Sequence, residues 1–308
     1  MIGLGAIGAS YAAKLSAARG VDLVVIAEGE RAVHLERDGV VVNDQRFDLS
    51  VVRPDEPVEP ADLVIVAVKG PALAEAIAQI AGHVGPGTIL LSLLNGITSE
   101  DELAAAYPQA TVLYAIAVGI DAVREGNRIS YAQAGKTVFG EAANVAPYAP
   151  AVRWLADLFE AAGLAYEIPA DMIHQLWWKF MVNDGVNQVT ALLRAPYAAV
   201  QTAGSPAWET MLAAQREVVA VARALGIDLG EADLASWFGV LATLGPDRYT
   251  SMAQDARAGR VTEADMFGGL VRRLGEQTGV PVPVNTVLHQ LLLAQTELAT
   301  GAGRTPPQ

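Results

Sequence analysis

A glycine-rich hexamer at the start of the chain constrains its fold more than any other feature. Residues 3–8 read GLGAIG, the form G-x-G-x-x-G, and lead into an amphipathic stretch at 6–18. In such a motif the first glycine permits a tight turn, the second lets the backbone approach a pyrophosphate, and the third allows close helix packing. A plain structural turn is the alternative, but the helix and strand that follow favour dinucleotide binding. The predicted cofactor-binding residues of this motif are Gly3, Gly5, Ala6, Ile7 and Gly8.

The rest of the first half alternates short apolar runs with helical patterns. Near-continuous β-branched runs are typical of strands covered on both faces, and the amphipathic stretches between them are typical of crossover helices in a parallel sheet. We therefore predict a doubly wound α/β dinucleotide-binding domain over residues 1–169. The predicted strands are 21–27, 62–68, 88–94, 111–118 and 165–168, the helices are 6–18, 71–82, 98–106 and 148–162, and hairpins are expected within 40–52 and 127–141, the second turning at Gly135-Lys136.

The first strand of this sheet is unusually short in the sequence. Only Met1 and Ile2 precede the glycine motif, whereas a mean strand has about five or six residues. Because the first strand of such a sheet is central, its loss would destabilise the domain. We expect the natural polypeptide to carry several more apolar residues upstream.

After Pro169 the hydrophobic period becomes helical throughout. Breaks fall at Ala195-Pro196, at Gly226, at Gly245-Pro246 and at 280–283. We predict an all-helical substrate and catalytic domain over residues 170–308, with a tail at 301–308 that frays. The predicted helices are 171–193, 205–225, 231–243, 263–278 and 285–300.

Composition narrows the class of protein. The 308 residues are 52% hydrophobic and 18% charged, which suits two domains with large cores and excludes intrinsic disorder. Zero cysteines exclude disulfides and thiolate sites, and a net charge of −13 argues against nucleic acid and anionic membranes as partners. No run approaches the ~20 apolar residues of a membrane span, and no leader pattern opens the chain. We expect a cytoplasmic protein, and the apolar helical half is compatible with a homodimer.

An acid at the end of the second predicted strand bears on the choice of cofactor. Glu28 lies 20 residues beyond Gly8, where a carboxylate would accept hydrogen bonds from the adenosine ribose and repel a 2′-phosphate. This favours NADH mildly. The alternatives are that Glu28 merely starts a helix, or that Arg31 swings round to meet a phosphate.

Three polar residues form one row on the helix predicted at 171–193. Lys179, Asn183 and Asn187 are each four residues apart, among apolar neighbours. An ammonium donor beside two amides suits a carbonyl oxygen that gains negative charge as hydride arrives. A hydrogen-bonded seam between helices explains the spacing equally well. Gly185 costs ~1 kcal/mol in a helix relative to alanine, which indicates close packing there.

Other polar residues have both a functional and a plain interpretation. Lys69 and Asn95 follow predicted strands, where ligands of open α/β sheets bind, yet a solvated strand exit and an Asn-Gly turn explain them too. Residues 262–265 read TEAD, which suits a threonine cap with acids in the first helical turn. Alternatively Glu263 positions the Lys179 ammonium group, with the Ser251 hydroxyl nearby for an anionic substrate.

Metal and nucleophilic-serine chemistry find no support in the sequence. The four histidines are scattered without the paired spacing of a metal site. Neither a G-x-S-x-G elbow nor a P-loop occurs. We expect no metal.

In order and spacing, several motifs together resemble the 2-dehydropantoate 2-reductase (ketopantoate reductase) family over nearly the whole chain. The resemblance implies a Rossmann-type domain followed by an all-α domain like the C-terminal domain of 6-phosphogluconate dehydrogenases. It also implies NADPH- or NADH-dependent reduction of ketopantoate to (R)-pantoate, in pantothenate and coenzyme A biosynthesis. The matching stretches are residues 3–8 (GLGAIG), 67–69 (AVK), 94–97 (LNGI), 176–183 (LWWKFMVN) with Asn187, 251–255 (SMAQD) and 262–265 (TEAD).

The resemblance also implies roles for individual residues. Lys179 would be the general acid, and Glu263 would support it and contact the substrate. The substrate-binding residues would be Asn183, Asn187, Ser251 and Asn95, and Lys69 and Asn95 would lie at the nicotinamide end of the site.

Three positions depart from the family pattern. Many relatives carry a basic residue where Glu28 stands, asparagine where Gly268 stands, and glutamine where Leu94 stands. The family mostly uses NADPH, so Glu28 leaves the choice of coenzyme open. The alternatives are a reductase or dehydrogenase of a related 2-keto or hydroxy acid, and a non-catalytic sensor of nicotinamide nucleotides.

Overall fold

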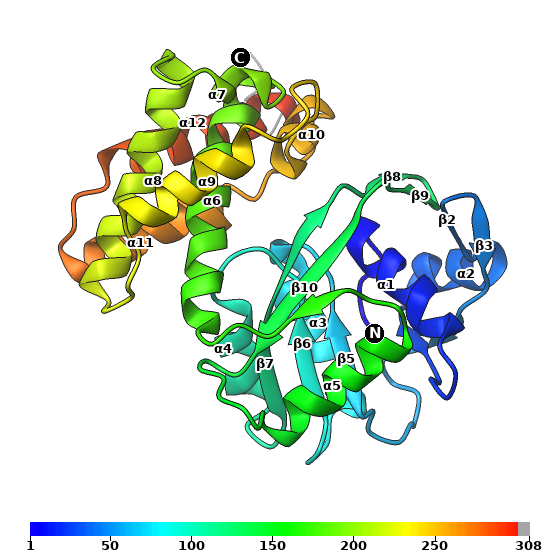
Figure 1. The fold of residues 1–308 in the computed structure, drawn as a ribbon. Coiled ribbons are helices and arrows are strands. Elements are labelled where there is room, and N and C mark those ends of the chain that lie inside the picture. Colours follow the sequence, from blue (N-terminus) through cyan, green and yellow to red (C-terminus); the bar gives the residue numbers. More distant parts are fainter. Residues whose placement is uncertain (301–308) are drawn as a thin grey trace, which may run out of the picture. The chain divides into compact units, whose positions relative to one another are not determined.

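Parallel strands form the centre of the first half of the chain in the computed structural model, which describes residues 1–300 (Figure 1). Strands β5, β6 and β7 are parallel neighbours, β1 pairs with β4, and Ile2 bridges Ile26 of β1 and Val66 of β5. Ile2 therefore occupies the place of the central first strand. The bounds are β1 Val24–Ile26, β4 Ser50–Val52, β5 Leu63–Val66, β6 Ile89–Ser92 and β7 Thr111–Ile120.

Helices cover both faces of this sheet, as the predicted doubly wound fold requires. Successive strand residues point to opposite faces. Ile65 and Leu91 pack in one core cluster with α1 and α5, whereas Val64 and Leu90 pack in another with α3 and α4. The bounds are α1 Ala6–Ala17, α2 Gly29–Asp38, η1 Gly70–Ala72, α3 Leu73–Gln79, η2 Ala81–His83, α4 Ser99–Ala106 and α5 Pro150–Ala161. The predicted strands and helices of this half are confirmed, with shorter strands except for β7, which continues to Ile120.

The prediction of two hairpins is half right. The first hairpin joins β2 and β3 through Asn43 and Asp44, both at positive φ. The second prediction is wrong, because the hairpin there turns at Gly126-Asn127, between β8 and β9. These four strands form a small sheet of order β3-β2-β9-β8. Their bounds are β2 Val40–Val42, β3 Gln45–Phe47, β8 Val123–Glu125 and β9 Arg128–Ser130.

Gly135 lies inside a strand instead of in a turn. It belongs to β10 (Ala134–Gly140), which pairs antiparallel with β7 and parallel with β11 (Tyr166–Glu167). Gly135 has φ +63°, and a Cβ there would lie 2.3 Å from the Val118 carbonyl oxygen. The glycine is therefore required by close approach of two strands, and the main sheet is mixed, not wholly parallel.

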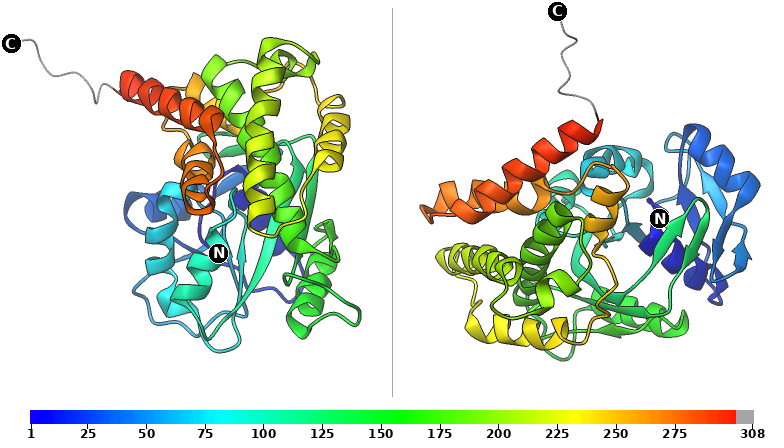
Figure 2. Two further views of the ribbon diagram at one scale, coloured as in Figure 1. Left: turned by 90° about the vertical axis from the view of Figure 1, so that its left-hand side faces the viewer. Right: turned by 90° about the horizontal axis from the view of Figure 1, so that it is seen from above.

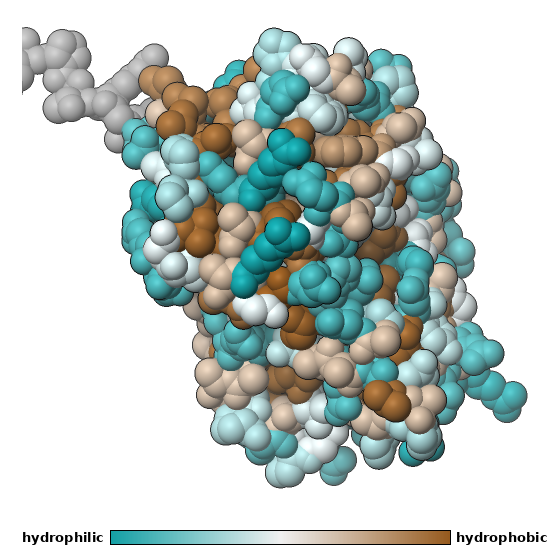
Figure 3. Space-filling model, turned by 60° about the vertical axis from the view of Figure 1, so that its left-hand side comes forward, coloured by the Kyte–Doolittle hydropathy of each residue, from teal (hydrophilic) through white to brown (hydrophobic). Residues whose placement is uncertain are grey.

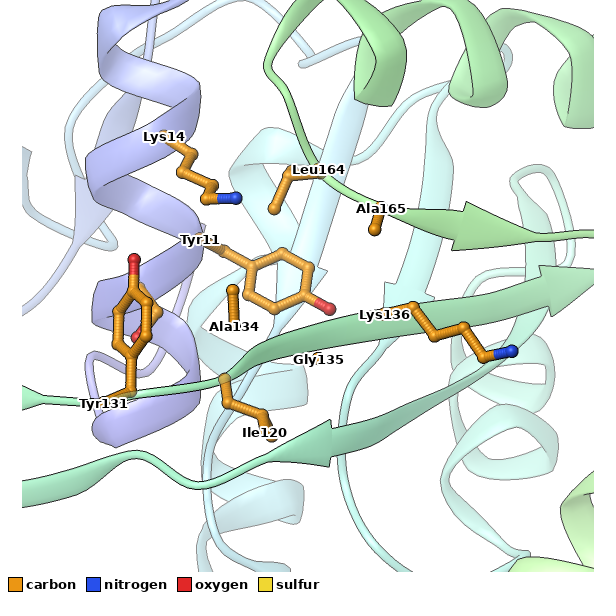
Figure 4. Close-up of a pocket in the computed structure, with 10 residues that line it drawn as sticks. Tyr11, Lys14, Ile120, Tyr131, Ala134, Gly135, Lys136, Leu164 and Ala165 are labelled. Carbon is orange, nitrogen blue, oxygen red and sulfur yellow. The ribbon is translucent and has the colours of Figure 1, made fainter.

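Two hydrogen bonds fasten α1 to its surroundings. The Tyr11 hydroxyl lies 2.5 Å from the Thr137 hydroxyl of β10, and Lys14 Nζ donates to the Gly163 carbonyl at 2.7 Å. Figure 4 shows Tyr11 reaching from α1 toward the strand that carries Lys136. These bonds hold the helix whose first turn follows the glycine motif.

By packing, the chain divides into two units, Met1–Leu176 and a second that begins at Trp177. This division falls inside one continuous helix, α6 (Met172–Leu193). The domain boundary near Pro169 stays a prediction. The predicted fraying of the tail concerns residues 301–308, which lie outside the described part of the chain.

The second unit is helical, as predicted (Figure 2). Its aromatic contacts join neighbouring helices: the ring centroids of Trp208 and Phe238 lie 5.2 Å apart. Two short helices, α7 and α10, were not predicted. Besides α6, the helices are α7 Ala198–Gln201, α8 Pro206–Ala224, α9 Glu231–Leu241, α10 Ser251–Arg257, η3 Asp265–Gly269, α11 Leu270–Thr278 and α12 Pro283–Thr300.

The predicted threonine cap before the fourth long helix is wrong. The helical segment begins at Asp265 with Ala264 at the cap position, and its first turn, η3, is π-helical. The Thr262 hydroxyl is buried and has no hydrogen-bond partner in the described residues. Among those residues, no helix combines the length and hydrophobicity needed to cross a membrane.

Phe139→Ala tests whether the aromatic cluster under α5 holds the first unit together. Phe139 is fully buried, and its ring centroid lies 5.4 Å from that of Phe159. We expect a loss of about 3–5 kcal/mol in the free energy of unfolding, because the truncation leaves a cavity. Urea titration followed by circular dichroism measures it. Val145→Ala, at an 80% exposed position, is the control, and equal losses in the two variants would contradict the assignment.

Candidate active site

The glycine loop is shaped by its contact with the end of β5. Gly3 has φ +89°, and a Cβ there would lie 2.5 Å from the Ala67 carbonyl group. A Cβ at Gly8 would lie 2.0 Å from the Gly3 carbonyl oxygen. Gly3 and Gly8 are thus required by the fold itself, since any side chain would collide with backbone.

Gly5 is different, because no atom of the described residues comes close to the position that a Cβ would take there. A Cβ at Gly5 would meet only the Ala67 carbonyl oxygen, 4.0 Å away. Gly5 is also the N-cap of α1, where no side chain caps the helix and no acid occupies the first turn. The uncapped N–H groups and the open space fit the pyrophosphate of a dinucleotide.

The other predicted cofactor residues follow the carboxyl ends of neighbouring strands. Glu28 comes after β1, Lys69 after β5 and Asn95 after β6. Since Ile2 bridges β1 and β5, and β5 pairs in parallel with β6, these three residues and the glycine loop lie along one edge of the sheet. Ligands of open α/β sheets bind at this edge.

The Glu28 carboxylate already has a partner within the protein. Glu28 stands at the N-cap position of α2 but makes no capping hydrogen bond. Its Oε1 accepts a hydrogen bond of 2.8 Å from Gln79 Nε2, which also donates to Glu75. A ribose hydroxyl would therefore share this carboxylate with Gln79, a residue that the sequence did not single out.

A buried chain of hydroxyl groups holds both ends of the loop that carries Asn95. Leu94 N–H donates to Ser92 Oγ at 3.3 Å, Ser92 and Ser99 lie 2.7 Å apart through their Oγ atoms, and Ser99 Oγ donates to Glu100 Oε2 at 2.9 Å. Burial raises the pKa of Glu100 to about 7. Nothing in the predictions from the sequence pointed to this chain, although Ser92 within an apolar strand is a recognisable signal.

The predicted polar row of the second unit exists on α6. Lys179 and Asn183 are half-buried, and Asn187 is 4% exposed. Four-residue spacing on a continuous helix places the three side chains on one face. A seam of partly buried polar groups in an apolar helix must find its partners in the protein or in a ligand.

An aromatic contact brings Glu263 to the same part of the unit as Lys179. Phe180, the residue after Lys179, stacks on Phe267 of η3 with centroids 6.1 Å apart. The backbone carbonyl of Glu263 accepts hydrogen bonds from Met266 and Phe267, so this turn follows Glu263 directly. The role of Glu263 toward Lys179 stays a prediction.

Ser251 is attached to α6 through its neighbour. Thr250 caps α10 by accepting from Ala253 N–H, and its hydroxyl lies 2.9 Å from that of Thr190 on α6. Thr190 lies one turn beyond Asn187. The bond places the exposed Ser251 beside the end of the polar row.

The structure thus assembles the predicted site residues in two sets, one in each unit. The glycine loop, Glu28, Lys69 and Asn95 share a sheet edge in the first, and the remaining predicted residues gather around α6 in the second. In the described part of the chain, no three or more His, Asp or Glu residues group in a way that could hold a metal ion.

This sheet edge and the open glycine loop define the class of Rossmann-type dinucleotide-binding proteins with a helical second unit. The model of the family described as Ketopantoate reductase PanE/ApbA matches residues 1–144, and that of its C-terminal part matches residues 171–296. The chain belongs to the ketopantoate reductase family, and it is an oxidoreductase.

Individual relatives agree with this assignment. The chain is 30% identical to the 2-dehydropantoate 2-reductase of Halobacterium salinarum over 289 residues, which cover 90% of this chain and 93% of that one. Its fold is similar to that of the PanE/ApbA family ketopantoate reductase from Ralstonia eutropha JMP134, with a TM-score of 0.81, 27% identity and coverage of 96% and 97%.

A D-mandelate dehydrogenase solved with NADH and anilino(oxo)acetate is also similar, with a TM-score of 0.86 and coverage of 97% and 98%. At 23% identity it shows the fold alone.

Glu100→Gln tests the buried hydroxyl chain. In the folded protein the Glu100 carboxyl keeps its proton up to about pH 7, whereas in the unfolded chain it loses it near its ordinary value of 4.5. Wild-type stability should therefore fall relative to E100Q as the pH rises from 4.5 to 7, by about 3 kcal/mol in total.

Urea unfolding at a series of pH values measures this difference. Glu125→Gln, at an exposed strand position, is the matched control. Parallel stability profiles for wild type and E100Q would contradict the burial argument.

Proposed function

We propose that this protein is an NAD(P)H-dependent 2-dehydropantoate 2-reductase, which converts ketopantoate to (R)-pantoate in pantothenate and coenzyme A biosynthesis. The observation that carries the proposal is the row of Lys179, Asn183 and Asn187 on α6, in a chain that belongs to the ketopantoate reductase family. The names of its relatives support the substrate.

The first unit supplies the cofactor-binding residues. A bound reduced nicotinamide supplies the hydride. The N–H groups at the start of α1 bind the pyrophosphate, and the bare Gly5 lets it approach. Glu28 accepts a hydrogen bond from the adenosine ribose, while Lys69 and Asn95 orient the nicotinamide end. Glu28 favours NADH and the family tendency favours NADPH, so both coenzymes belong in the assay.

The second unit supplies the proton and binds the substrate. Lys179 donates a proton from Nζ to the keto oxygen as hydride reaches the carbon, so that an alcohol forms without a free alkoxide. Glu263 holds the ammonium group in place and contacts the substrate. The amides of Asn183 and Asn187 and the hydroxyl of Ser251 bind the hydroxyl and carboxylate groups.

A surface of α12 supports the homodimer expected from the sequence. Val287, Leu291 and Leu298 lie on one face of α12 and are 53%, 47% and 84% exposed. Figure 3 shows apolar surface where this helix ends. A dimer and a cytoplasmic location remain proposals.

Gly5→Ala tests the dinucleotide site without disturbing the fold. Its backbone φ of −68° suits alanine, and the nearest atom to the added Cβ within residues 1–300 is the Ala67 carbonyl oxygen, 4.0 Å away. We expect unchanged thermal stability and at least about tenfold weaker binding of NADH or NADPH, measured by fluorescence titration. Gly8→Ala, whose Cβ would meet backbone at 2.0 Å, should instead lower the stability. Unchanged coenzyme affinity in G5A would contradict the site.

Lys179→Ala tests the reaction itself. Loss of reduced-nicotinamide absorbance with ketopantoate, run with NADH and NADPH in parallel, measures turnover. We expect kcat to fall by about 10²- to 10⁴-fold in K179A while coenzyme affinity stays the same, because only the proton donor is lost. Lys136→Ala, which removes a surface lysine paired with Glu167, is the control. Full turnover in K179A would remove Lys179 from the role, and wild type inactive with both coenzymes would overturn the function.

A further inference from the structure

A second polar row runs along α6, beside the row of Lys179. Asp184 and Gln188 each follow one residue after an asparagine of the first row, and both are fully buried. Gln188 Nε2 donates to Asp184 Oδ1 at 2.9 Å. Burying a carboxyl and an amide costs free energy unless each is hydrogen-bonded, because both lose their hydrogen bonds to water.

This row connects α6 to α12 and α8. Gln188 Nε2 also donates to Asn285 Oδ1 at 2.8 Å, and Asn285 Nδ2 donates to the Ala214 carbonyl at 3.0 Å. The Glu217 carboxylate accepts from the N–H groups of Val284 and Asn285, both at 2.8 Å, at the start of α12. Three helices are thereby tied through one set of buried hydrogen bonds.

Two glycines provide the room that the buried amides need. A Cβ at Gly268, in the π-helical turn η3, would lie 2.3 Å from Gln188 Oε1. A Cβ at Gly185 would lie 2.5 Å from Gln215 Cγ. The close packing expected at Gly185 is therefore with Gln215 of α8. Gln188 reaches the turn that directly follows Glu263, so one residue contacts both the helix of Lys179 and the segment of Glu263.

The unpartnered polar atoms of the row include more acceptors than donors. Asp184 Oδ2, Gln188 Oε1 and Gln215 Oε1 are buried acceptors with no partner among the described residues, and Gln215 Nε2 is a buried donor with none. As a carboxylate, Asp184 leaves three such acceptors beside one donor. With a proton on Oδ2 it becomes a donor, so that the unpartnered donors equal the two amide oxygens in number.

The electrostatic surroundings of Asp184 also favour its protonated form. Burial, and then the like charge of Glu217 on α8, raise the pKa of Asp184 well above its ordinary value. Asp265 of η3 and His289 of α12 pair at 2.7 Å. The other ionisable groups on α6 and on the elements packed against it are His174 and Lys179 of α6, Glu209, Arg216 and Arg223 of α8, Arg272, Arg273 and Glu276 of α11, and Glu297 of α12. Among the described residues, Asp184 forms no ion pair with a cation.

From this geometry we propose that Asp184 is a positioning residue that acts as a neutral carboxylic acid. Through Gln188 it fixes the rotation of α6 against α12 and η3, and thereby the placement of Lys179 relative to Glu263. The inference rests on the proposed function, because its effect on catalysis is read through Lys179.

Asp184→Asn and Asp184→Ala separate this role from a general loss of packing. D184N keeps the volume, one donor and one acceptor, and should retain kcat within about threefold of wild type. D184A removes one of the two hydrogen bonds of Gln188 Nε2 and should lower kcat by about 10- to 100-fold with unchanged coenzyme affinity, since the dinucleotide residues lie in the other unit. Gln188→Met keeps the side-chain length but removes the hydrogen bonds to Asp184 and Asn285, and it should lower kcat by a similar factor. It takes the place of D184A in the test if D184A fails to fold. Gln201→Met, at a glutamine that bonds to the Leu241 and Leu244 carbonyls, is the control.

The pH dependence of stability tests the neutral state independently of turnover. The raised pKa of Asp184 in the folded state means that this carboxyl lowers the stability of wild type as the pH rises above about 4, where the unfolded carboxyl ionises. D184N lacks this contribution, while the contribution of Glu100 is the same in both proteins. The Tm of D184N minus that of wild type should therefore increase between about pH 5 and pH 8.

Each outcome decides the proposal. A Tm difference that stays constant with pH, a D184N variant as impaired as D184A, or full kcat in Gln188→Met would overturn it. If wild type shows no turnover with keto acids, the proposed function fails, while the Tm measurement still reports whether Asp184 is neutral.

Discussion

The first unit depends on the close approach of the glycine loop to the end of β5. At Gly3 and Gly8 the backbone comes so near to other backbone that no side chain fits, and this contact fixes the path from Ile2 into α1. The bonds of Tyr11 and Lys14 hold the helix that follows. Because the loop is fixed from the protein side, the open space at Gly5 remains for a ligand.

In the helical unit the corresponding constraint is that α6 carries polar groups on two faces. Lys179 and Asn183 are half-buried and Asn187 is buried, while Asp184 and Gln188 are wholly enclosed. Gln188 is hydrogen-bonded to both Asp184 and Asn285, so rotating α6 would break more than one buried hydrogen bond at once. The hydrogen bonds of the core therefore also fix the direction in which the row of Lys179 faces.

Much of the fold could be predicted because its signals are local. Continuous apolar runs such as 62–68 became strands covered on both faces, and the spacing of Lys179, Asn183 and Asn187 predicted their common face. Predictions failed where a distant partner decided the outcome. The local sequence around Gly135 predicts a turn, but Gly135 lies in a strand that pairs with β7. The TEAD segment predicts a helix cap, but the helical segment begins only at Asp265, in a π-helical turn.

The sequence by itself determined the glycine loop, the order of strands and helices, and the polar row of α6, because each follows from neighbouring residues or from a fixed helical period. Only the tertiary structure decided that Gln79 holds Glu28, that Ser92 and Ser99 connect to Glu100, and that Gln188 meets Asn285. These contacts join residues from separate elements or depend on burial. Hydrogen bonding across a core depends on which helices pack together, and no local pattern specifies that.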